Sequence, residues 1–154
     1  MNGTFLVNGS YASVLFDTGA DKSFVSLEFE PLLTCDRSKL LNSFTVKVAS
    51  RESITVDSII RNCTLNLNEH NFSIDLNPMQ LGSFDIIIGM DWLAKHHAEI
   101  VCFEKLIRIP LPSGDTLIIY GEKPSKRLKL MSCTQARKYL RKEYMAFLAN
   151  IVAK

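Results

Sequence analysis

The stretch Val14-Leu15-Phe16-Asp17-Thr18-Gly19-Ala20 decides the fold expected for this chain. Three apolar residues that suit a buried strand run directly into an acidic residue, and small residues follow it. The segment before Asp17 is a predicted hairpin, because Asn8-Gly9 separates two β-prone runs, Thr4 to Val7 and Tyr11 to Phe16, and both turn residues tolerate positive φ angles. The sequence therefore predicts that Asp17 lies on a turn at a strand end, where a rigid element fixes its direction.

A second apolar strand lies well downstream of this segment. Phe84-Asp85-Ile86-Ile87-Ile88-Gly89 is apolar apart from Asp85 and ends in glycine. Met90 to His96 then predicts a short helix with Trp92 and Leu93 turned inward. An Asp-Thr-Gly triplet alone is common by chance, so the downstream strand and helix are what make the first segment informative.

The rest of residues 1–120 is typical of an all-β domain with many short strands. Residues 44–48 alternate between apolar and polar, and an apolar pattern resumes at 54–60 after a polar break that suits a hairpin tip. Further strands are predicted at Thr64 to Leu67, Phe72 to Leu76, Ile100 to Phe103, Leu106 to Ile109 and Thr116 to Tyr120. Asn77-Pro78 is predicted to end the second of these strands.

Residues 121–154 differ from the body in charge. They hold nine Lys or Arg and two Asp or Glu, whereas residues 1–120 hold nine and fourteen. Residues 121–131 suit a linker, and Ser132 with Gln135 forms a capping box at the start of an amphipathic helix whose apolar face reaches Ile151. The pattern favours a solvated basic linker and helix over contact with nucleic acid.

This chain resembles the retropepsin-type proteases over two stretches, Val14-Leu15-Phe16-Asp17-Thr18-Gly19-Ala20-Asp21-Lys22-Ser23-Phe24-Val25 and Phe84-Asp85-Ile86-Ile87-Ile88-Gly89-Met90-Asp91-Trp92-Leu93. It is most similar to the proteases encoded in Ty3/gypsy-type retrotransposons of plants. The similarity extends through residues 97–100 to residues 108–110. Residues 132–149 resemble the stretch that joins protease to reverse transcriptase in such polyproteins, so the resemblance covers nearly the whole chain.

The resemblance implies an all-β, closed-barrel-like acid protease fold with one short internal helix and an appended C-terminal helix. Residues 1–120 would form the protease domain, and residues 121–154 a basic linker and amphipathic helix leading toward a reverse transcriptase. The implied function is an aspartic endopeptidase that cleaves a retrotransposon polyprotein. It would act as a homodimer on a peptide or polyprotein substrate, without a cofactor.

The chemistry of such an enzyme explains why a second copy is needed. Peptide hydrolysis without a covalent intermediate uses a water held between two carboxyl groups, which share a proton because both cannot ionise cheaply at close range. The chain has one Asp-Thr-Gly, at Asp17. Asp85 and Asp91 lack the Thr-Gly context and are expected to be structural. A two-fold axis that brings Asp17 against its counterpart supplies the missing carboxyl.

The resemblance also implies roles for the neighbours of Asp17. Thr18 would grip the other subunit's loop, and Gly19 would allow the tight turn. Gly89 would let the preceding strand pack beside this loop. Substrate contacts would come from the loop, the strand and a flap tip around Arg51, through Ala20, Asp21, Ser50, Arg51, Glu52 and Ile88. Two positions depart from many viral relatives: Met90 stands where they have Arg, and residues 49–53 contain no glycine.

Metal chemistry is not expected. The four cysteines are far apart in sequence, which suits reduced and mostly buried thiols rather than a zinc site. His96 and His97 face apart and have no third ligand near them in sequence, so they are predicted to be surface histidines.

The N-terminus has no signal-like start, which favours an intracellular, cytoplasmic protein, or a virus-like particle if the element is active. Two other functions stay open. The chain could be a catalytically silent descendant that binds peptides or dimerises, as the glycine-free flap suggests. It could also be a cellular adaptor with a retropepsin-like fold, as in ubiquitin-shuttle proteins, although residues 132–149 argue against this.

Overall fold

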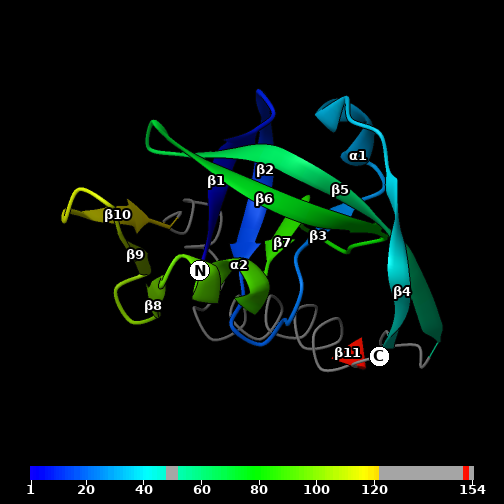
Figure 1. Ribbon diagram of the computed structural model, residues 1–154. Helices are drawn as coiled ribbons and strands as arrows, with labels where there is room; N and C mark the ends of the chain where they lie inside the picture. The colour runs from blue at the N-terminus through cyan, green and yellow to red at the C-terminus, as the bar shows by residue number, and fades with distance from the viewer. Residues whose placement is uncertain (48–51, 122–150, 153–154) are drawn as a thin grey trace, which may run out of the picture.

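The computed structural model describes residues 1–47, 52–121 and 151–152. Short strands dominate this part of the chain, and two short helices interrupt them (Figure 1). In chain order the elements are β1 (Asn2–Val7), β2 (Ser10–Phe16), β3 (Phe24–Ser26), α1 (Glu30–Leu33), β4 (Ser38–Lys47), β5 (Ser53–Leu67), β6 (His70–Met79), β7 (Ile86–Ile88), α2 (Met90–Lys95), β8 (Glu99–Val101), β9 (Leu106–Pro110), β10 (Thr116–Tyr120) and β11 (Ile151–Val152).

Six of these strands close into a barrel. They are hydrogen-bonded in the order β1-β2-β7-β3-β6-β5, and β5 pairs again with β1. Beyond β5 the sheet continues into β4 and β11, whereas β8, β9 and β10 form a separate three-stranded sheet. The β4–β5 hairpin and this small sheet lie at opposite ends of the molecule (Figure 1). The predicted all-β closed-barrel fold is therefore confirmed.

The N-terminal hairpin forms as predicted. Asn8 and Gly9 have φ angles of 50° and 85°, and Val7 pairs with Ser10 across the turn. A left-handed backbone at both positions matches the twist of the flanking strands, which is why Asn-Gly suits this place. The hairpin delivers Phe16, and then Asp17, to the end of β2.

Two sequence-based strand boundaries were wrong. The patterns at 54–60 and 64–67 belong to one continuous strand, β5, in which a bulge between Ile60 and Cys63 hides the continuity by shifting the alternation. Asn77-Pro78 does not end β6, because Pro78 pairs with Val25 of β3. The strand tolerates the proline because the preceding residue makes the bond, Asn77 N donating to Ser23 O at 2.9 Å.

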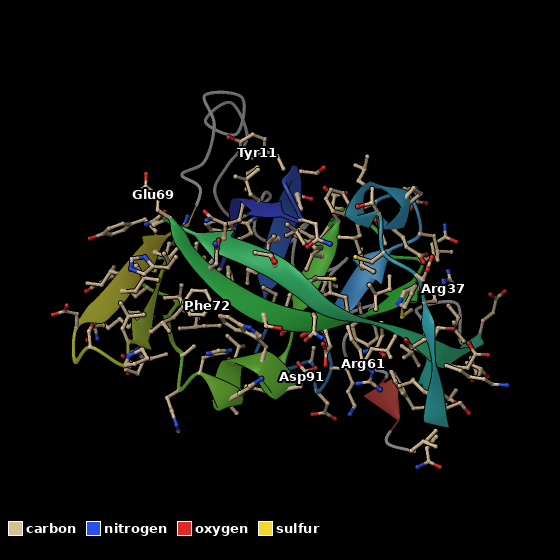
Figure 2. The ribbon with its side chains drawn as sticks, turned by 45° about the horizontal axis from the view of Figure 1, so that its top comes forward. Tyr11, Arg37, Arg61, Glu69, Phe72 and Asp91 are labelled. Carbon is tan, nitrogen blue, oxygen red and sulfur yellow. The ribbon has the colours of Figure 1, made fainter. Side chains whose placement is uncertain are left out.

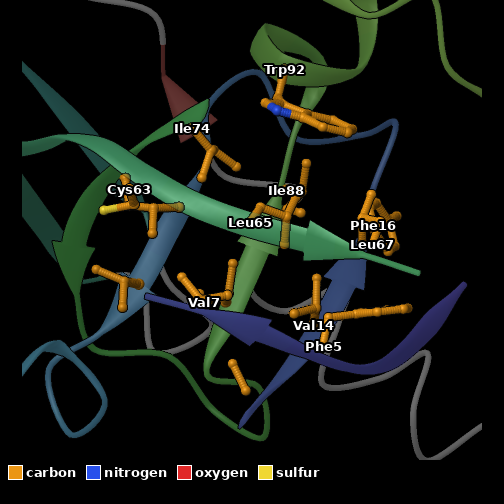
Figure 3. Packing of buried hydrophobic residues seen from close by; sticks show 14 of the residues in the cluster. Phe5, Val7, Val14, Phe16, Cys63, Leu65, Leu67, Ile74, Ile88 and Trp92 are labelled. Atoms are coloured by element: carbon orange, nitrogen blue, oxygen red, sulfur yellow. The ribbon is translucent and has the colours of Figure 1, made fainter. Parts of the chain in front are cut away.

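Apolar side chains fill the barrel in one large cluster. Phe5, Val14 and Leu65 come from three different strands and are at most 9% exposed. Trp92 of α2 lies over Ile88 and Phe16 at one end of this cluster (Figure 3). Burial of a large aromatic side chain is among the strongest contributions to a core, so α2 is held firmly against the barrel. The prediction that Trp92 and Leu93 face inward is confirmed.

The predicted C-terminal helix lies outside the described residues, as does the basic linker before it. One residue assigned to its apolar face is described, and there the prediction was wrong. Ile151 belongs to β11 and pairs with Val46 of β4. The open edge of β4 offers unpaired backbone groups, and two residues of extended chain satisfy them. No helix in the described segments is long and apolar enough to cross a membrane.

The expectations for cysteine and histidine need correction. Cys63 is buried, but Cys35 and Cys102 are exposed, and all three are free thiols. His97 is exposed, but His96 is half-buried. Its ring lies 4.4 Å from that of Trp92 and 5.3 Å from that of Phe72, and this burial lowers the pKa of the imidazole. The ring turns inward because α2 packs onto β6. The sequence shows only that His96 follows the helix, and it does not show this contact.

Candidate active site

Asp17 lies where two parallel strands end side by side. β2 and β7 pair with Val14 opposite Ile86 and Phe16 opposite Ile88. Asp17 N then donates to Ile88 O at 2.9 Å, so the loop begins fixed to the neighbouring strand. Because both strands are buried, the Asp17 side chain starts from a rigid platform, as the sequence predicted.

The Asp17 carboxyl is almost completely buried, at 1% exposure. Oδ1 accepts a hydrogen bond from Gly19 N at 2.8 Å. Oδ2 is buried and has no hydrogen-bond partner among the described residues. Burial raises the pKa of the carboxyl from 3.8 to about 6, against the opposing effect of the Gly19 hydrogen bond. This carboxyl therefore retains a proton far more readily than an ordinary aspartate.

Asp17 makes the stability of a separate subunit depend on pH. Between pH 3.8 and about 6 the folded chain keeps a proton that the unfolded chain releases, so stability falls as the pH rises through this window. The loss amounts to about 3 kcal/mol of unfolding free energy. We expect denaturant titrations at low protein concentration to show that the difference in unfolding free energy between wild type and Asp17→Asn changes with pH. A difference that is constant with pH would contradict this environment for Asp17.

Gly89 brings β7 and α2 into contact with the loop that carries Asp17, residues 17–23. A Cβ at this position would lie 2.6 Å from Ala20 O and closer still to Lys22 O. Only glycine permits this approach, which lets Met90 N donate to Ala20 O at 2.7 Å. The role predicted for Gly89 therefore has a direct geometric basis.

The other predicted loop residues divide by exposure. Thr18, Gly19 and Asp21 are exposed, so their surfaces are free to meet a second molecule. Ala20 is fully buried, in a second apolar cluster beside the loop. Ile88 is also fully buried, within the barrel core. Because both side chains are buried, Ala20 and Ile88 support the Asp17 loop by packing beneath it.

The β4–β5 hairpin packs against the Asp17 loop through the same second cluster. Phe44 and Val46 of β4 join Ala20 and Phe24 there, and the rings of Phe24 and Phe44 lie 6.2 Å apart. Lys22 Nζ lies 6.0 Å from the centre of the Phe44 ring. The part of the hairpin next to its tip is thus packed against the loop that carries Asp17.

The predicted flap residues belong to the segment between β4 and β5. The two strands pair up to Lys47 opposite Ser53, and residues 48–51 between them lie outside the described residues. Ser50 and Arg51 fall outside the described residues, whereas Glu52 is described and exposed.

Asp85 and Asp91 have structural partners. Asp85 Oδ2 accepts from Ser13 N at 2.9 Å, and Asp85 N donates to Ser13 Oγ at 3.0 Å. Asp91 Oδ1 accepts from Ser23 Oγ at 2.7 Å and from Trp92 N at 2.8 Å. Neither carboxylate is paired with Asp17. The sequence did not predict the roles of Ser13 and Ser23, because a single serine belongs to no motif that indicates its hydrogen-bond partner.

Comparison with known proteins agrees with this geometry. The family model described as retroviral aspartyl protease matches residues 1–113. The chain belongs to the retroviral aspartyl protease family. The match includes the Asp17 loop, the β4–β5 hairpin and the Gly89 turn, so all parts of the candidate site lie in the family domain. No curated protein sequence matches the chain.

Solved structures of retroviral protease type are similar to this family member. The retroviral protease-like domain of Ddi1 from Leishmania major has a TM-score of 0.58 at 16% identity, over 80% of this chain and 94% of that domain. The EIAV protease in complex with an inhibitor has a TM-score of 0.46 at 20% identity, over 66% of this chain and 91% of that protein. At such identities the first similarity supports the fold alone.

Proposed function

We propose that this retroviral aspartyl protease domain is an aspartic endopeptidase in which two copies of the chain each contribute Asp17. The observation that carries the proposal is the Asp17 carboxyl itself. It is buried at the meeting point of two parallel strands, its pKa is raised to about 6, and Oδ2 has no partner within the described residues. A second carboxyl and a water across a two-fold axis would supply those missing interactions.

The raised pKa suits the chemistry of a shared proton. Two Asp17 carboxyls at close range hold one proton between them, and the pair titrates as a unit. The ionised member accepts a proton from the attacking water, while the protonated member donates to the oxygen of the scissile carbonyl. A carboxyl that already favours its protonated form lowers the cost of building such a pair.

The exposed residues around Asp17 suit contacts with a partner and a substrate. Thr18 is assigned to the grip between the two loops, and Gly19 and Asp21 to the substrate backbone. Ala20 and Ile88 are assigned to the wall behind the substrate, which they shape by packing. The flap tip, Ser50, Arg51 and Glu52, is assigned to the substrate's other side, where closure would exclude water.

The natural substrate in this proposal is the polyprotein of a plant Ty3/gypsy-type retrotransposon, cleaved in the cytoplasm or in a virus-like particle. Support for this origin comes from the sequence resemblance over residues 84–93 and 132–149. The proposal places the protease domain at residues 1–120 and a basic joining segment at residues 121–154, where nucleic-acid contact is the less favoured role.

Limited proteolysis checks this division of the chain. We expect trypsin to cut first within residues 121–131, which contain four Lys or Arg, while residues 1–120 resist. Packed strands protect the backbone of the protease domain, and no such protection is expected in a joining segment. Mass spectrometry of the early fragments identifies the cut. Equal resistance of both segments would count against two units.

Cleavage of a mixed peptide library at mildly acidic pH tests the proposed activity. Wild-type cleavage should rise more steeply than linearly with protein concentration, because only dimers carry two Asp17 carboxyls. Activity strictly proportional to concentration, with monomers in solution, would refute the dimeric site. Protein that is folded and dimeric but cuts nothing would instead support a silent peptide-binding module.

A further inference from the structure

Ser23 lies at the centre of a hydrogen-bond network behind the catalytic loop. It is completely buried, and its hydroxyl touches two groups from the β7–α2 turn. Gly89 N donates to Ser23 Oγ at 3.0 Å, and Ser23 Oγ donates to Asp91 Oδ1 at 2.7 Å. Asn77 of β6 adds two bonds from its backbone and side-chain nitrogens to Ser23 O, both at 2.9 Å. Three elements distant in sequence therefore meet at one serine.

The same turn is bonded along the length of the catalytic loop. Asp17 N donates to Ile88 O, Met90 N donates to Ala20 O, and Asp91 N donates to Asp21 O at 3.1 Å. Together with the Ser23 hydroxyl, these bonds fasten residues 17–23 to residues 88–91. The position of the Asp17 carboxyl and of Gly19 N, which binds it, thus depends on how well this turn is held.

The Ser23 hydroxyl can accept from Gly89 N only if its own proton points to another acceptor. A hydroxyl has one proton to donate, and its lone pairs accept. Gly89 N needs a lone pair, so the Ser23 proton must point elsewhere. Asp91 Oδ1 receives that proton, and the same oxygen also receives Trp92 N at 2.8 Å. An acceptor at Asp91 is therefore required by two donors, one in the loop and one in α2.

We propose that Asp91 is a positioning residue for the Asp17 dyad, acting through Ser23. It lies at the start of α2, where Figure 2 labels it, and its carboxylate is hydrogen-bonded to Ser23 and Trp92 rather than to Asp17. Its acceptor oxygen fixes the Ser23 hydroxyl, the hydroxyl fixes Gly89, and the turn at Gly89 fixes the loop that carries Asp17. The inference rests on the proposed protease function only for its effect on catalysis, because its effect on loop order is measurable without any activity.

The test compares two substitutions of Asp91. Asp91→Asn keeps an oxygen that accepts both hydrogen bonds, whereas Asp91→Ala removes it. Amide hydrogen exchange by NMR at Asp17 N and Gly19 N reports whether the loop is held. We expect exchange protection at both amides to fall at least roughly tenfold in Asp91→Ala and to stay at the wild-type level in Asp91→Asn. Amides of β9 and β10, in the separate sheet, should be unchanged.

Kinetics on a cleaved peptide give the second readout. Misplacement of a reacting group by about an ångström costs on the order of 100-fold in rate, so kcat should fall roughly 10- to 100-fold in Asp91→Ala with little change in KM. Asp91→Asn should restore kcat. Trp92 is the single tryptophan of the chain, so its fluorescence shows whether α2 stays packed in each variant.

Unchanged protection of Asp17 N and Gly19 N in Asp91→Ala would overturn the inference, whatever the kinetics show. Equal loss in Asp91→Asn and Asp91→Ala would overturn it too, because charge rather than the accepting oxygen would then be responsible. A wild-type protein that cuts no peptide would end the proposed function, but the exchange comparison would still decide whether Asp91 holds the loop.

Discussion

Asp17→Asn should abolish peptide cleavage while leaving the fold intact. The amide cannot act as an acid or a base, and proton transfer by positioned groups contributes about 10²- to 10⁴-fold to rate, with two carboxyls lost per dimer. Stability should not suffer, because an amide keeps an acceptor for Gly19 N and avoids the cost of a buried charge. Cleavage assays with the purified variant measure the loss of activity, and circular dichroism shows whether the fold is intact.

Asp85→Asn is the matched control for this prediction. Asp85 is a carboxylate of the same domain whose Oδ2 accepts from Ser13 N at 2.9 Å, and the amide of asparagine can still accept this bond. Its cleavage rate should stay within a few-fold of wild type. Full activity in Asp17→Asn, or an equal loss in both variants, would show that Asp17 is not the reacting group.

Gly89→Ala should be the most damaging single-methyl substitution in the site. The new Cβ would lie 2.6 Å from Ala20 O and nearer to Lys22 O, and both are backbone atoms that move only if the loop moves. Overpacking of this kind costs about 1–3 kcal/mol or more of unfolding free energy. Activity should be lost as well, because the loop that yields is the one that carries Asp17.

Gly82→Ala separates this clash from the general effect of replacing glycine. A Cβ at Gly82 meets nothing within 4 Å, and the residue does not have a positive φ. Chemical denaturation should therefore show Gly82→Ala close to wild type and Gly89→Ala clearly destabilised. Equal stability of the two variants would mean that Gly89 and the Asp17 loop are not packed as closely as the structure has them.

The sequence predicted the parts of the fold that carry strong local signals. Asn8-Gly9 specified its own turn, the run before Asp17 specified a buried strand, and α2 followed from Trp92 and Leu93. Strand β3 was missed, because three residues are too few for an alternating pattern. The continuity of β5 was missed for a different reason, since the bulge near Asn62 reverses which side chains face the core.

The candidate site was predictable only where a motif marked it. Asp17 and its turn were recognised from their context, whereas Ser23 was not, although it joins the loop to α2. Its role arises from the approach of β7 to the loop, and a contact between residues so distant in sequence leaves no local trace. Burial of Ala20 and Ile88 is likewise a product of packing between segments distant in sequence.

Subunit mixing tests the central claim, that one site uses Asp17 from two chains. Wild-type protein is combined with an equal amount of Asp17→Asn, exchanged to equilibrium, and assayed at constant total concentration. Random pairing leaves about one quarter of the dimers with two Asp17 carboxyls, so activity should fall to about a quarter of the all-wild-type value. Activity of one half would mean that each chain works alone, and would contradict the shared dyad.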